Sequence, residues 1–115
     1  MAAVETKELE TIELLQTHYY KASYDEIKQL YLEILGTMGH SVVSVNDDYC
    51  EIFSEAPHMT VTAKVIMQTP KETSIDFYIN SEFLFGASKK AYRFIQEVYK
   101  KIEAKYELKG LSLHK

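Results

Sequence analysis

Several residue types are scarce in this chain of 115 residues, and each scarcity excludes a class of structure or function. Cys50 is the only cysteine, so no disulfide can form within the chain. Arg93 is the only arginine. Because arginine is the residue that most often reads bases or clamps phosphates, we expect no sequence-specific binding to nucleic acid. No apolar run approaches the roughly 18 residues that a membrane-spanning helix needs, so we expect no membrane segment.

What remains is the composition of an ordinary globular protein. Apolar residues make up 46% of the chain and charged residues 26%, which is typical of a single domain of this size over residues 1–115. The first ten residues lack the basic and then apolar order of a signal peptide, and together with the single cysteine this favours a cytosolic location. We expect residues 1–8 and 111–115 to be loosely ordered tails.

Strict alternation of apolar and polar residues dominates the middle of the chain. From Met59 to Gln68 and again from Ser74 to Asn80, every second residue is apolar, a period of two that is typical of strands with one buried face. Turn-forming residues separate such stretches, including Pro57 and Pro70. The pattern predicts an antiparallel meander of four strands: Ser41–Asn46, Tyr49–Glu55, Met59–Gln68 and Thr73–Ser81.

Amphipathic helices flank these strands. The stretch Ser23–Met38 repeats apolar residues at steps of three and four, and Ser23 and Glu26 have the spacing of a capping box. The stretch Ser88–Glu107 has an equally clear apolar stripe, with Gly110 placed to end it. Ile34 and Ile95 lie at the centres of the two stripes. We therefore expect both helices to pack on one face of the sheet.

Residues 11–20 fit either a strand or a helix, and we favour a strand because Thr17, Tyr19 and Tyr20 suit one. The order of elements is then β-α-β-β-β-β-α, and the fold class is α+β. This order resembles half of the TATA-binding-protein fold and a reduced helix-grip fold. The resemblance is confined to the order of elements and implies no functional residue.

No catalytic, cofactor or metal site is recognisable. The four histidines form no metal-ligand spacing, and Asp47 and Asp48 lack the further oxygen ligands of a calcium loop. His18 lies within the first expected strand. It could act as the base for Cys50 as the nucleophile only if the fold brings the two residues together. We therefore expect no cofactor, no bound metal and a protein that is not an enzyme.

Tyrosine is the residue in excess, with nine copies. If Tyr20, Tyr49 and Tyr78 lie on the sheet face away from the helices, they form an aromatic surface suited to a second copy or another protein. Our leading expectation is therefore a non-enzymatic, self-associating interaction module, most simply a homodimer. A helix-grip-like binder of a small apolar ligand is the alternative. An enzyme with a site assembled by the fold comes third. The cavity of the alternative would be lined by Met59, Met67, Phe77, Phe85 and Ile95.

Overall fold

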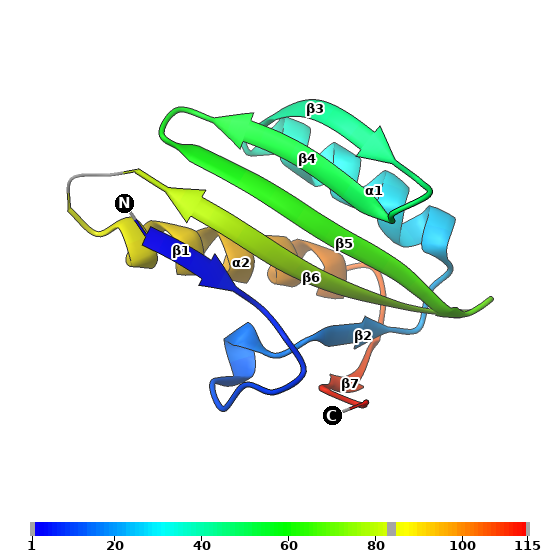
Figure 1. Cartoon of the computed structure of the whole chain (residues 1–115). Helices are drawn as coiled ribbons and strands as arrows, with labels where there is room; N and C mark the ends of the chain where they lie inside the picture. The colour runs from blue at the N-terminus through cyan, green and yellow to red at the C-terminus, as the bar shows by residue number, and fades with distance from the viewer. Residues whose placement is uncertain (1, 83–84, 115) are drawn as a thin grey trace.

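The computed structural model describes residues 2–82 and 85–114, and Figure 1 shows the arrangement of their elements. In chain order the elements are β1 (Ala2–Glu5), the 3-10 helix η1 (Glu13–Leu15), β2 (His18–Tyr20), α1 (Tyr24–Thr37), β3 (Ser41–Asn46), β4 (Glu51–Ala56), β5 (Met59–Thr69), β6 (Glu72–Ser81), α2 (Ala87–Glu103) and β7 (Leu108–Leu111).

One antiparallel sheet contains all seven strands. Its order is β3-β4-β5-β6-β2-β7, and β1 pairs with β6 next to β2. The predicted four-strand meander is confirmed in β3 to β6, with bounds that differ from the expected ones by at most two residues. The expected α+β fold and its order of strands and helices are likewise confirmed.

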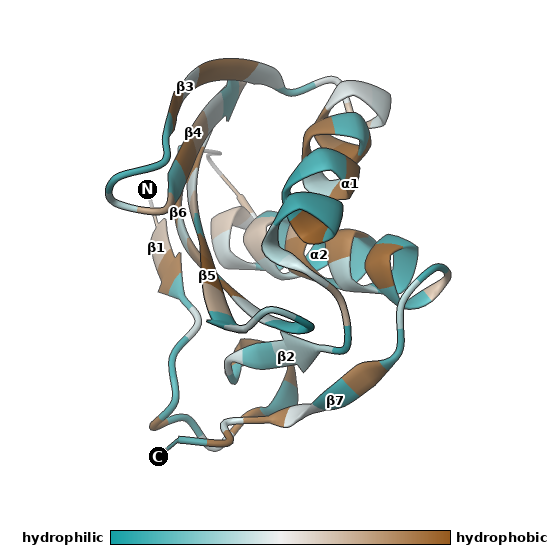
Figure 2. Ribbon diagram, turned by 90° about the vertical axis from the view of Figure 1, so that its right-hand side faces the viewer, coloured by the Kyte–Doolittle hydropathy of each residue, from teal (hydrophilic) through white to brown (hydrophobic). Residues whose placement is uncertain are grey.

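Both helices cover the same face of the sheet, as Figure 2 shows from the side. The core between them contains Ile34 of α1 and Ile95 of α2, which are 3% and 0% exposed. The apolar positions of the alternating strands, such as Val61 and Ile79, fill the layer beneath. We call the opposite side of the sheet the open face, because no helix of the described chain packs on it.

The capping box predicted at the start of α1 is present. Ser23 Oγ accepts a hydrogen bond from the backbone N–H of Glu26, and the Glu26 side chain accepts one from the backbone N–H of Ser23. These bonds satisfy two N–H groups that a helix start otherwise leaves free. The helix therefore begins where the sequence predicted.

The end predicted for the last helix is wrong. Helix α2 ends at Glu103, not at Glu107, and Gly110 lies within strand β7. The apolar stripe continues to Tyr106, so the sequence pattern alone gives no sign that the helix ends before that residue. Pairing of Leu108 with Tyr20 of β2 requires the chain to turn back before that residue, and this tertiary contact ends the helix early.

Within the described chain, parts of both expected tails pair with the sheet, whereas residues 1 and 115 lie outside the described residues. Residues 2–5 form β1, which pairs with the last residues of β6, and Val4 and Thr6 are buried. At the other end Leu111 belongs to β7, and buried Ser112 donates its backbone N–H to Thr17 O at 2.9 Å. These strands have four residues each, too few to show a period of two.

The ambiguous residues 11–20 contain both kinds of structure. Glu13–Leu15 form the 3-10 helix η1, and the strand is limited to His18–Tyr20, where all three residues are buried. A strand was expected over the whole stretch, but the regular strand is confined to its last three residues, and before them Gln16 forms an isolated parallel bridge with Lys7. No helix among the described residues is long and apolar enough to cross a membrane.

Candidate functional site

The tyrosine surface predicted on the open face is not formed, because Tyr20 lies on the helix side. In the pairing of β2 with β6, Tyr20 lies opposite Thr73, which shares the helix face with Ile75. Tyr20 is fully buried, and its hydroxyl donates a hydrogen bond to Glu103 of α2 at 2.9 Å. Its neighbour Tyr19 takes the opposite side. The sequence could not fix which of the two tyrosines faces the core.

Tyr49 and Tyr78 are exposed but do not complete such a surface. Tyr49 is 71% exposed in the turn between β3 and β4, and Tyr78 is 45% exposed on the open face of β6. The positions that surround Tyr78 across β5 and β6 are mostly polar. They include Thr60, Thr62, Lys64, Asp76 and Asn80. The open face therefore lacks the continuous apolar area that a large face-to-face dimer requires.

The five residues expected to line an apolar cavity are separated by the fold. Met59, Phe77 and Ile95 are core residues with exposed fractions of 8% or less, whereas Met67 and Phe85 are exposed at 57% and 84%. Met67 keeps the apolar phase of β5 but remains exposed, and it borders a hollow beside the start of α1. These five side chains therefore do not enclose one space.

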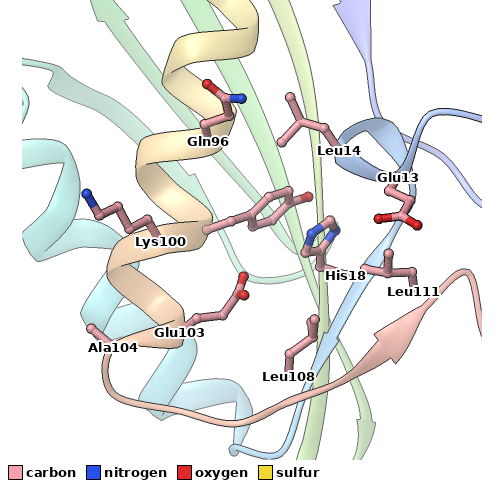
Figure 3. A pocket seen from close by; sticks show the side chains of 10 residues that line it. Glu13, Leu14, His18, Gln96, Lys100, Glu103, Ala104, Leu108 and Leu111 are labelled. Carbon is pink, nitrogen blue, oxygen red and sulfur yellow. The ribbon is translucent and has the colours of Figure 1, made fainter.

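A pocket of about 640 Å³ opens instead at the end of the sheet where β2 and β7 meet α2 and η1 (Figure 3). Its walls come from two stretches that are distant in sequence, residues 13–18 and 96–111, which is why no sequence motif marks it. The lining residues are Glu13, Leu14, His18, Gln96, Tyr99, Lys100, Glu103, Ala104, Leu108 and Leu111. We call this space the His18 pocket.

His18 is the most constrained polar residue of this pocket. It is only 6% exposed, and its ring stacks on that of Tyr99, with centroids 3.4 Å apart and planes inclined by 10°. His18 Nδ1 lies 2.8 Å from Gln16 O, and because a carbonyl can only accept, Nδ1 carries the hydrogen. The lone pair of Nε2 then has no protein partner among the described residues. This imidazole presents an acceptor to the pocket.

Burial also fixes the charge of this ring. Loss of hydration lowers the pKa of His18 to about 4, and the hydrogen bond to Gln16 opposes this effect only in part. The ring is therefore neutral at physiological pH. A neutral imidazole with so low a pKa accepts hydrogen bonds but takes up a proton poorly, so it is a weak general base near pH 7.

The charged residues of the pocket are two carboxylates and one ammonium group. Glu13 comes from η1, and Glu103 and Lys100 come from α2, as Figure 3 shows. Glu103 also accepts the hydrogen bond from Tyr20, which holds its carboxylate toward the sheet. Hydrogen-bond acceptors therefore outnumber cationic donors in this space.

His18 and Cys50 do not form a catalytic pair. Cys50 lies in the turn before β4 and accepts a hydrogen bond from the backbone N–H of Val65 in β5, so strands β5 and β6 separate it from β2. Its Sγ lies 3.8 Å from Asp47 O, and the two residues line a separate hollow beside α1. Asp47 itself accepts from Lys28 Nζ at 2.8 Å and from the hydroxyl of Tyr24 at 2.9 Å, so both of its partners are residues of α1. Within the described part of the chain, no three His, Cys, Asp or Glu residues are grouped so as to hold a metal ion.

A second polar cluster lies behind the pocket, where β1 and β2 meet along the same edge of β6. Thr6 donates its hydroxyl to Asp76 Oδ1 at 2.6 Å, and Thr17 lies 2.9 Å from both carboxylate oxygens. Burial raises the pKa of Asp76 to about 6, although both threonine hydrogen bonds lower it. The residue after Thr17 is His18, so this cluster fixes the strand that presents the imidazole.

Sequence reasoning identified His18 as the one histidine within a strand, but it did not find the partners of this residue. Tyr99 lies within the helix predicted over Ser88–Glu107, Leu108 lies just after it, and Leu111 lies in the predicted tail, so none of them was predicted to meet His18. Comparison with known proteins adds no relative: no protein-family model matches the chain, and no curated protein is significantly similar to it.

Proposed function

We propose that the chain is a non-enzymatic binding module whose ligand site is the His18 pocket. One observation carries the proposal: a buried imidazole with a free lone pair at Nε2 borders a pocket large enough for a small molecule. Because Nε2 is not among the fully buried atoms that lack a partner, this acceptor is open to a hydrogen-bond donor of a bound molecule. The proposal includes a cytosolic location, in keeping with the single cysteine.

The chemistry of the lining supports binding in preference to catalysis. His18 has too low a pKa to serve as an effective base near neutral pH. No serine, threonine or cysteine is among the described residues that line the pocket. Burial raises the pKa of Tyr99 well above its ordinary value, so this hydroxyl stays protonated and is a poor nucleophile.

Nuclear magnetic resonance of the nitrogen-15-labelled protein tests this proposal. During titration with a library of small fragments, we expect the amide signals of His18, Leu108 and Leu111 to shift, while that of Thr62 on the open face stays in place. The variant His18→Phe keeps an aromatic ring against Tyr99 but lacks Nε2, and it should lose these shifts. Fragments that shift only signals of the open face would contradict the proposal.

A homodimer joined through β3 is a second candidate function. This strand forms one edge of the sheet, and all six of its residues are exposed, including Val42, Val43 and Val45. An edge strand presents unpaired backbone N–H and C=O groups to which a second strand can add. Antiparallel pairing of β3 with the same strand of a second copy would give an isologous dimer.

Light scattering at micromolar concentration tests the dimer. If β3 joins two copies, Val43→Lys should give a monomer with an unchanged circular dichroism spectrum, because the lysine would lie within the new interface. The control Val43→Thr keeps a β-branched side chain and should remain dimeric. A monomeric parent protein would remove this candidate and leave the pocket proposal unaffected.

A further inference from the structure

The hydrogen-bonding groups of the His18 pocket indicate what kind of molecule it accepts. His18 Nε2 can only accept, as can the carboxylates of Glu13 and Glu103. Lys100 is the one cationic donor of the lining, Gln96 can both donate and accept, and the hydroxyl of Tyr99 is buried without a hydrogen-bond partner. A ligand that brings donors satisfies more of these groups than one that brings acceptors.

The charges around the pocket favour the same kind of ligand. The lining carries two carboxylates against one ammonium, and the ring of His18 adds no positive charge at neutral pH. A ligand carboxylate would meet two like charges, whereas a ligand ammonium meets two opposite ones. The two glutamates come from separate elements, η1 and α2, so a cation between them would contact both sides of the pocket (Figure 3).

The remaining walls are apolar. Leu14, Leu108 and Leu111 are each only half-buried, and they come from η1 and β7. With Ala104 they form an apolar surface beside the polar groups. A ligand body that covers these leucines would gain the free energy of removing their surface from water.

Another polar hollow of the described chain differs from the His18 pocket in these features. The hollow around Asp76 on the open face has its central carboxylate already hydrogen-bonded by Thr6 and Thr17. The His18 pocket instead has a nine-tenths-buried side chain whose acceptor atom is free.

We propose that the His18 pocket binds a protonated amine attached to a small apolar group, with the ammonium donating to His18 Nε2 and facing Glu13 and Glu103. This inference rests on the proposed function, because it names the ligand class of the same site. The apolar group covers Leu108 and Leu111.

Three probes with one aromatic body and different charge test the ligand class. They are 2-phenylethylamine, 2-phenylethanol and 3-phenylpropionate, and binding is followed through the amide signals of His18 and Leu108. We expect the amine to bind most tightly and the carboxylate at least about tenfold more weakly, a difference of about 1.4 kcal/mol.

Two charge variants supply controls that leave the core intact, because both side chains are exposed. Glu13→Gln should weaken binding of the amine severalfold, and Lys100→Gln should strengthen it. The neutral alcohol should respond to neither. If Glu13→Gln weakens binding of the amine and Lys100→Gln strengthens it, the charge of these side chains, and not their shape, sets the affinity.

The outcomes separate this inference from the proposed function. Tighter binding of the carboxylate in this pocket, strengthened by Glu13→Gln, would overturn the ligand class and leave the binding function in place. Equal affinity of all three probes would also overturn the ligand class. If none of the three probes and no library fragment shifts the signals of His18 and Leu108 at millimolar concentration, both proposals fail.

Discussion

Replacing Asp76 with asparagine should change how the stability of this protein depends on pH. Burial raises the pKa of the Asp76 carboxyl from 3.8 to about 6, so the folded protein holds this proton more tightly than the unfolded chain does. The resulting stabilisation is fully present below about pH 4 and is lost as the pH rises through 6. At about 1.4 kcal/mol for each pH unit, the loss is at most about 3 kcal/mol, because the half-buried carboxylate keeps some contact with solvent.

His18 acts in the opposite direction over the same range. Burial lowers its pKa from 6.5 to about 4, so its contribution to stability is present above pH 6.5 and is lost as the pH falls through 4. By the same conversion this contribution is also about 3 kcal/mol. The two contributions oppose each other in the parent protein, and the variant Asp76→Asn removes only one of them.

Urea unfolding, monitored by circular dichroism at pH 4, 5, 6 and 7, gives the free energy of unfolding of the parent and of Asp76→Asn at each pH. Relative to the parent, Asp76→Asn should be equally stable near pH 4 and more stable at pH 7, by up to about 3 kcal/mol. The exposed Asp48 supplies a control, because Asp48→Asn makes the same chemical change at a side chain outside the core. A difference between parent and Asp76→Asn that stays constant from pH 4 to 7 would refute the assignment of a buried, proton-linked carboxyl.

Three further outcomes can be measured with the same methods. Ile34→Ala and Ile95→Ala should each lower the free energy of unfolding by about 2 to 5 kcal/mol, because both side chains lie in the core, and unchanged unfolding curves would contradict that packing. Tyr20→Phe should cost about 1 to 3 kcal/mol through loss of the hydrogen bond to Glu103, whereas exposed Tyr49→Phe should cost almost nothing. A chelator should leave the melting temperature unchanged, and a shift reversed by one metal ion would reveal a site that the sequence pattern missed.

The sequence predicted those parts of the fold that are long enough to show a period. The meander from Ser41 to Ser81 alternates over many residues, and each helix repeats its stripe for several turns. Strands β1 and β7 have four residues each and depend on partners far away in the sequence. β1 pairs with the free edge of β6, and β7 pairs with the free edge of β2. The local sequence of a four-residue strand carries no information about these distant edges.

The candidate site was harder to predict for a related reason. His18 was noticed because a histidine within a strand is unusual, but its importance comes from Tyr99, which stacks on it from α2. Tyr20 was assigned to the wrong face, since a three-residue strand next to another tyrosine leaves the phase of the alternation open. Both errors concern contacts between distant segments, which only the folded chain brings together.

The sharing of one edge of β6 by β1 and β2 has a consequence for the order in which the chain can fold during synthesis. Both short strands leave the ribosome before α1, β3, β4 and β5, yet their common partner follows all of these. Tyr19 and Tyr20 therefore have no strand to pair with while the intervening helix and hairpins assemble. Strands β1 and β2 are therefore made before β6 but can join the sheet only after β6 has been made.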